Sequence, residues 1–72
     1  MEHYKNFNGD SGVLAYHIGA DFIEVRFRTG RSYLYTYASA GSSNIERMKA
    51  LARGGSGLNR FINLYVKYKY AR

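Results

Sequence analysis

Residues 22–37 have the sequence Phe22-Ile23-Glu24-Val25-Arg26-Phe27-Arg28-Thr29-Gly30-Arg31-Ser32-Tyr33-Leu34-Tyr35-Thr36-Tyr37. Apolar and polar residues alternate on both sides of Thr29-Gly30, which predicts two antiparallel strands joined by a turn. Three apolar residues of the first strand share one face and are expected in the core: Ile23, Val25 and Phe27. Charged residues occupy the opposite face and are expected to meet water: Glu24, Arg26 and Arg28.

The length of the turn sets the register, and the register decides on which face the tyrosines lie. A two-residue loop would place the β-branched Thr29 at positive φ, whereas the three-residue loop 28–30 needs only Gly30 in the left-handed region. We therefore favour the longer loop, which pairs Phe27 with Arg31, Val25 with Tyr33 and Ile23 with Tyr35. Tyr33, Tyr35 and, if the strand extends that far, Tyr37 are then expected on the core side. The other register would place these rings beside the arginines as a surface that stacks bases.

A third strand precedes the hairpin. Residues 13–18 alternate, so Leu14, Tyr16 and Ile18 are predicted on one face and Val13, Ala15 and His17 on the other. Residues 19–21 then turn the chain into the hairpin, which gives an antiparallel three-stranded meander.

Two helices are predicted after the meander. Ser43-Asn44-Ile45-Glu46 fits a capping box that starts the first, and Gly54 or Gly55 ends it. An apolar stripe of this helix is expected against the sheet, with its basic residues turned away from it. The stripe consists of Ile45, Met48, Leu51 and Ala52, and the basic residues are Arg47, Lys49 and Arg53.

The second helix should begin near Ser56 and run for about ten residues, because apolar residues recur at helical spacing. These residues are Leu58, Phe61, Ile62 and Tyr65. In residues 66–72 aromatic and basic residues alternate, which suits either a short C-terminal edge strand or a basic tail. The predicted fold is α+β: one small domain, residues 1–72, with a three-stranded meander and two helices packed on one face.

Composition supports this interpretation. The 72 residues are 46% hydrophobic and 17% aromatic, enough for one thin core, and the absence of Cys excludes disulfides and thiolate metal sites. No run approaches the roughly 20 apolar residues of a bilayer span, and the start Met1-Glu2-His3-Tyr4 does not have the pattern of a secretory signal. A cytoplasmic protein is expected.

Charge is distributed unevenly along the chain. Residues 1–24 carry a net charge of −3, whereas residues 25–72 carry +9. A strongly cationic region attracts polyanions, so RNA, another nucleic acid or an anionic lipid surface is the first partner to consider. The alternative explanation is that the surplus charge serves only solubility.

Three groups of basic residues are candidates for phosphate contact. Arg26, Arg28 and Arg31 crowd the hairpin, although arginines there could equally deter pairing between sheets. Arg53 and Arg60 flank the glycine joint 54–57, which a helix C-cap followed by a helix start also explains. Lys67 and Lys69 alternate with tyrosines in the tail, a combination typical of single-strand binders but also of an edge strand.

Catalysis finds little support in the residues. His3 and His17 lie far apart without a carboxylate at ligand spacing, so no metal is expected. No nucleophile motif orders the serines, and so short a chain has little material to enclose a substrate. The sequence predicts a protein that is not an enzyme and needs no cofactor.

Residues 11–66 resemble the KTSC domain, a short bacterial module also found at the C-terminus of some lysyl-tRNA synthetases. Four features carry the resemblance: Ile18-Gly19; Val25-Arg26-Phe27 with Gly30; Tyr33-Leu34-Tyr35; and Gly55, Asn59 and Ile62. The chain departs from the pattern at Ala20, where the family often has Tyr, and in having no Pro after Tyr35. The resemblance implies a small α+β fold and a function in RNA binding.

The expected function is therefore low-specificity nucleic acid binding, preferably of RNA, through a basic face. The alternative is a protein-interaction module or small homo-oligomer, for which Leu34 among polar neighbours is the clearest indication. A third hypothesis is attachment of the tail, residues 67–72, to anionic lipid.

Overall fold

The computed structural model describes residues 1–7, 9 and 12–72. Its elements, in chain order, are the strands β1 (Glu2–His3), β2 (Val13–Ile18), β3 (Phe22–Phe27) and β4 (Ser32–Thr36), the helices α1 (Tyr37–Ala40), α2 (Ser42–Gly54) and α3 (Leu58–Phe61), and the π-helix η1 (Ile62–Val66). The strands form one antiparallel sheet in the order β1-β2-β3-β4. The predicted α+β class is confirmed, and the meander gains one short strand at its β2 edge.

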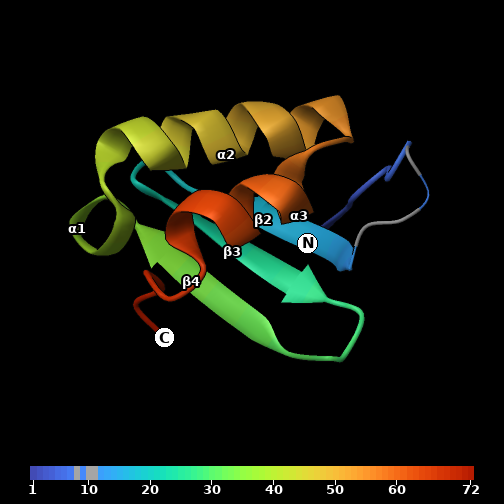
Figure 1. Cartoon of the computed structure of the whole chain (residues 1–72), viewed down its shortest axis with the longest axis horizontal. Coiled ribbons are helices and arrows are strands. Elements are labelled where there is room, and N and C mark those ends of the chain that lie inside the picture. Colours follow the sequence, from blue (N-terminus) through green and yellow to red (C-terminus); the bar gives the residue numbers. More distant parts are fainter. Residues whose placement is uncertain (8, 10–11) are drawn as a thin grey trace.

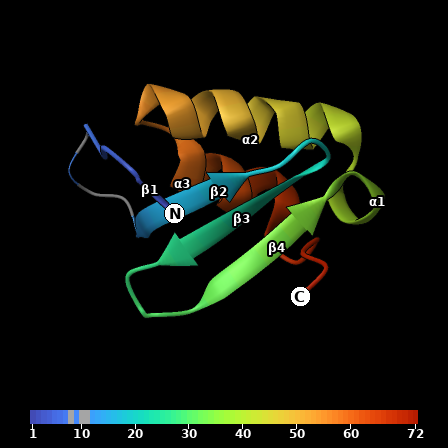
Figure 2. The ribbon, with the colours of Figure 1, turned by 180° about the vertical axis from the view of Figure 1, so that it is seen from behind.

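The helices α2 and α3 lie in a layer on one side of this sheet (Figure 1). Seen from behind, the sheet lies in front of these helices, and its second face is left open (Figure 2). The core fills the space between the two layers. It is made of buried side chains from both: Tyr4, Val13, Tyr16, Ile23, Val25, Tyr35, Ala40, Ile45, Met48, Ala52, Leu58, Ile62 and Val66.

The predicted hairpin register is confirmed. Ile23 lies opposite Tyr35 and Val25 opposite Tyr33. The amide of Gly30 donates to the carbonyl of Phe27 at 2.9 Å, with Gly30 at a φ of 94°. Only 1% of Tyr35 is exposed, and Tyr33 is half-buried against the core. Because Gly30 takes the left-handed conformation, Thr29 avoids it, as the turn chemistry predicts.

The prediction for Tyr37 was wrong. The strand ends at Thr36, whose side chain caps α1 in a capping box with Ser39. Tyr37 is therefore the first residue of a helical turn, and its exposed hydroxyl donates to Glu46 at 2.6 Å.

The capping box predicted at Ser43 and Glu46 was also wrong. Helix α2 begins at Ser42, with Gly41 as a cap that makes no side-chain hydrogen bond. Glu46 instead bonds Lys49 at 2.8 Å and the Tyr37 hydroxyl. The first turn of α2 is fixed by the preceding turn α1, which the sequence pattern did not show.

The apolar stripe of α2 is buried as predicted, but Lys49 does not turn away from the core. Its side chain is 7% exposed, and its ammonium donates to the carbonyl of Ala20 at 2.9 Å. The long apolar stem is buried while the charge is satisfied at its tip, which is how a lysine is tolerated there. The helix ends at Gly54, and Gly55 caps it in the left-handed region, as expected.

Strand β2 does not keep the alternation predicted for it. Its register against β3 shifts between Val13 and Ala15, as at a β-bulge. Val13 therefore joins Tyr16 in the core, and Leu14 is 38% exposed. An extra residue in one strand moves every residue before it to the other face.

Beyond α3 the helical periodicity also fails. A π-helix has more residues per turn than an α-helix, so the buried positions recur every four residues at Leu58, Ile62 and Val66. Tyr65, which the helical spacing grouped with Leu58, Phe61 and Ile62, is 59% exposed.

The C-terminal tail is not a regular strand. It nonetheless pairs with the β4 edge, because Ala71 donates to the carbonyl of Leu34 and Leu34 donates to the carbonyl of Arg72, both at 2.6 Å. Tyr70 packs on Tyr33 with 4.6 Å between ring centroids. The tail therefore covers part of the β4 edge of the sheet.

Candidate nucleic-acid interface

The open face of the sheet is the face opposite the helices α2 and α3 (Figure 2). Cross-strand pairing defines its members, since paired residues share a face. Ala15 lies opposite Arg26, His17 opposite Glu24, and Glu24 opposite Leu34. The outward side chains of β2, β3 and β4 therefore form one continuous surface.

Two hollows mark this surface. The first, of about 510 Å³, lies at the hairpin end between β1, β2 and β3. Arg26 and Arg28 line it together with His3 and Leu14. Both arginines are exposed, so their guanidinium groups are free to meet an anion in water.

The second hollow, of about 440 Å³, lies across β2, β3 and β4. Its lining consists of His17, Phe22, Glu24, Ser32, Leu34 and Arg72. The rings of His17 and Phe22 are 5.7 Å apart between centroids and tilted by 46°. Arg72 comes from the C-terminal tail, so a cation from the far end of the chain lines the same hollow as the two rings.

Gly19 holds the Phe22 ring in this position. A Cβ built on Gly19 would meet three atoms of that ring, the nearest at 2.0 Å. The amide of Gly19 also donates to the carbonyl of Phe22 at 3.0 Å. The ring can occupy this position only because residue 19 has no side chain.

The predicted basic residues do not all meet at one place. Arg26 and Arg28 lie together on the open face, and Arg31 is exposed just after the turn. Arg53 lies elsewhere, lining a hollow with Glu2 and Tyr16. The carboxylate of Glu2 accepts from the Tyr16 hydroxyl at 3.0 Å, and burial together with this bond raises the pKa of Tyr16.

At the glycine joint, the amide that begins α3 has a partner within the chain. The amide of Leu58, which begins α3, donates to the hydroxyl of the buried Tyr4 at 3.3 Å. Gly55 receives a bond from the amide of Phe7 on its carbonyl. Arg60 is exposed on α3, and the joint is bonded to the N-terminal arm at Tyr4 and Phe7.

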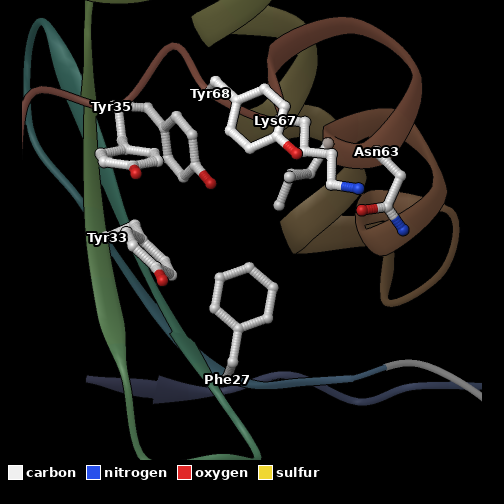
Figure 3. Close-up of a pocket in the computed structure, with 8 residues that line it drawn as sticks. Phe27, Tyr33, Tyr35, Asn63, Lys67 and Tyr68 are labelled. Carbon is white, nitrogen blue, oxygen red and sulfur yellow. The ribbon is translucent and has the colours of Figure 1, made fainter.

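Four residues of the KTSC resemblance meet in space. Phe27, Tyr33, Tyr35 and Ile62 line a pocket between the hairpin and η1, together with Lys67 (Figure 3). Lys69, the other basic tail residue predicted to contact phosphate, is exposed and donates its amide to Val66. Gly55 and Asn59 lie outside this lining.

Sequence reasoning missed the rings of Phe22 and His17 and the cation of Arg72 as parts of one surface. The alternation of β3 already placed Phe22 on the outward face beside Glu24, so the signal was present. The position of Arg72 was not readable, because it depends on the tail folding back to Leu34.

Within residues 1–7, 9 and 12–72, no three His, Asp or Glu side chains are placed to hold a metal ion. No helix in the described part of the chain is long and apolar enough to cross a bilayer. Comparisons of the chain with protein-family models, curated proteins and solved structures found no match. The resemblance to the KTSC domain therefore stays a prediction.

Proposed function

We propose that this chain binds single-stranded nucleic acid, preferably RNA, with low sequence specificity through the open face of its sheet. The observation that carries the proposal is the joint presence on that face of exposed arginines and of the His17–Phe22 ring pair. Such a face combines the two contacts that a single strand offers, phosphates for cations and bases for rings.

Charge favours an anionic ligand. Arg26, Arg28 and Arg72 line the two hollows, against Glu24 as the acid in their linings. The whole chain carries a net charge of +6, so its long-range field also attracts polyanions. Because guanidinium groups bind any phosphate, the expected sequence specificity is low.

The role we propose is binding, without catalysis. The hollows of the open face are shallow surfaces of a sheet, and their chemistry is that of cations, rings and a single carboxylate. This arrangement suits contact along a strand better than conversion of a bound substrate.

The experiment is a titration of a labelled eight-nucleotide RNA with the full chain at several salt concentrations. Each neutralised phosphate contributes a log-log slope of about −0.7, so contacts from Arg26, Arg28 and Arg72 predict a slope near −2. Arg26→Ala and Arg28→Ala should each weaken binding and make the slope shallower by about 0.7. Arg47→Ala is the matched control, because this exposed arginine lies on α2. No binding at about 50 mM salt would refute the proposal.

A protein-interaction module remains the second candidate, and one observation favours it. Leu64 is 61% exposed and Tyr65 is 59% exposed on the surface of η1, an unusual display of apolar area. Light scattering of the full chain across concentrations, with Leu64→Lys and Leu34→Lys as variants, tests it. Self-association that either variant abolishes, without any response to RNA, would favour this candidate over the first.

A further inference from the structure

A pocket of about 230 Å³ lies between the β3–β4 hairpin and η1, on the helix side of the sheet. Tyr33 and Tyr35 point from β4 toward the helical segment that carries Asn63 and Lys67, and Phe27 lies below them (Figure 3). The pocket is smaller than the roughly 300–1,000 Å³ typical of drug-sized ligands, so it suits one small planar group.

The walls of the pocket are aromatic. Tyr33 meets Tyr70 at 4.6 Å and Phe27 at 5.7 Å between ring centroids. Tyr35 meets Tyr70 edge-on at 6.3 Å. Rings on several sides favour a ligand with its own π-face, because stacked and edge-on contacts between rings are attractive.

The lining also contains a polar group, the hydroxyl of Tyr35. The Tyr35 side chain is almost wholly buried, with 1% of the residue exposed, yet no described residue forms a hydrogen bond with its hydroxyl. Since none of the fully buried side-chain oxygens in the described residues is without a partner, this hydroxyl is not sealed in the core and opens into the pocket. Burial, with the neighbouring Tyr33 and Tyr70, raises the pKa of Tyr35 to about 12, so the hydroxyl remains a hydrogen-bond donor at neutral pH.

The rim of the pocket selects the charge of the ligand. Lys67 is the one charged residue among the described residues that line it, and its ammonium lies 5.5 Å from the Tyr68 ring centroid. A second cation would be repelled here, which excludes the quaternary ammonium ligands that aromatic cages otherwise take. Asn63 adds an exposed amide with both a donor and an acceptor. A planar ring that bears an anionic group fits this set.

The pocket also shares one lining residue with a hollow of the open face. Phe27 lines both this pocket and the hollow that contains Arg26 and Arg28. A strand held by the arginines of the open face could therefore turn one base around the hairpin end.

We infer that this pocket binds a single nucleobase against the aromatic side chains that line it, with its phosphate at Lys67. The Tyr35 hydroxyl donates to a carbonyl or ring nitrogen of the base, and Asn63 contacts the base edge. The base comes either from a bound single strand or from a free nucleotide. The first source rests on the proposed function, and the second does not.

The test is NMR shift mapping on the full isotope-labelled chain with four probes: UMP, uridine, inorganic phosphate and an eight-nucleotide oligouridylate. UMP should shift the resonances of Tyr35, Asn63 and Lys67. Uridine should bind at the same residues but about fivefold more weakly, since it lacks the phosphate, and inorganic phosphate should leave the ring resonances unmoved.

Two variants locate the site. Tyr35→Phe removes only the hydroxyl and should weaken UMP binding about fivefold while the chain stays folded. Lys67→Ala should weaken UMP but not uridine, whereas Lys69→Ala, which removes the same charge outside the pocket lining, should change neither. Equal weakening by both lysine variants would overturn the inference, because it would show diffuse charge attraction.

The outcomes separate this inference from the proposed function. Binding of both UMP and oligouridylate at the pocket supports the inference with the strand as the source. Binding of UMP with no response to oligouridylate supports it with a free nucleotide as the source, and the proposed function then fails. Binding of oligouridylate on the open face, with no shift at Tyr35 or Asn63, overturns the inference and leaves the proposed function standing.

Discussion

Gly19 and Phe22 show how a residue without a side chain shapes a surface. The Phe22 ring occupies the space where a Cβ on residue 19 would lie, so Gly19→Ala must push the ring away from the open face. We expect the ring contact between Phe22 and His17 to be lost and RNA affinity to fall, with little loss of stability, because only the far end of one side chain must move. The ring-proton shifts of His17 report the change.

Gly54→Ala is the control for this variant, since a Cβ at Gly54 would meet no atom within 4 Å. It should leave the shifts of His17 and Phe22 as they are. Unaltered shifts in Gly19→Ala would contradict the close packing of ring and turn.

Ionisation of the Tyr35 hydroxyl should lower the stability of the folded chain at high pH. Its folded pKa of about 12 lies above the ordinary tyrosine value of 10.0, so folding favours the protonated hydroxyl. The contribution is fully present below pH 10 and is lost as pH rises from 10 toward 12, amounting to about 3 kcal/mol in all. Urea unfolding at pH 9 and pH 12 should show this loss in the full chain.

Tyr35→Phe should lose less stability over the same range, because it has no hydroxyl to ionise. The loss that remains comes from groups such as Tyr16 and Tyr37, whose pKa values are also raised. An identical pH dependence in both proteins would show that Tyr35 ionises without cost and is more open to water than the structure indicates.

The side of the sheet on which a residue lies was predictable wherever period-two alternation is unbroken, as at Val25 and Arg26. The prediction failed at Leu14, because a bulge adds a residue to β2 and the local sequence pattern does not reveal the bulge. Tyr4 was missed for another reason: it reaches the core through contacts with residues 14 and 58, which are distant in the chain. Lys49 was missed because its carbonyl partner belongs to the β2–β3 turn.

At the scale of the elements, two residues compete as the N-terminal cap of the helical region, Thr36 and Ser43. The Thr36 side chain accepts a hydrogen bond from the Ser39 amide at 3.0 Å, whereas Ser43, the cap that the sequence pattern favours, lies inside α2. Thr36→Ala should lower the free energy of unfolding by about 1 kcal/mol. Ser43→Ala should change it by less than about 0.5 kcal/mol. Urea unfolding of both variants decides between the caps, and the reverse order would restore the capping box at Ser43.

The π-helix η1 makes a second prediction at this scale. Val66 is fully buried, so Val66→Ala removes packed methyl groups and should cost about 2 kcal/mol. Tyr65→Ala should lower the free energy of unfolding by less, even though it removes a larger side chain. Tyr65 is mostly exposed, and its ring packs on that of Phe61 with 4.8 Å between the centroids. Thermal or urea unfolding measures both. A larger cost for Tyr65→Ala would mean that the segment keeps α-helical spacing.

The elements themselves were predictable in proportion to how local their causes are. The hairpin depends on the turn at 28–30 and on alternation beside it, and both are adjacent in the chain. The strand β1 is only two residues long, and its backbone pairs with β2. Because this pairing depends on distant residues, the local sequence at residues 2 and 3 does not predict a strand. The candidate site divides in the same way: Arg26 and Arg28 were found from the hairpin, while Arg72 and Asn63 required the tertiary fold.

At the scale of the whole molecule, the two sides of the sheet differ. The helices cover one side of the sheet and enclose the core (Figure 1). The other side keeps a surface of arginines and rings. The tail joins the two, since Tyr70 lines the pocket on the helix side and Arg72 lines a hollow of the open face.

The tail therefore has a structural role that a truncation can expose. Strand β4 is the last in the sheet order, and the backbone groups of Leu34 are satisfied by Ala71 and Arg72. Removing residues 69–72 leaves these groups unpaired and uncovers the ring of Tyr33, which creates a sheet edge able to pair with another copy. We expect the truncated chain to self-associate more strongly than the full chain, as measured by light scattering across concentrations. Arg72→Ala keeps the backbone bonds, so it should scatter like the full chain and show only weaker RNA binding. If the truncated chain instead scatters like the full chain at every concentration, the short pairing at Leu34 does not protect the edge.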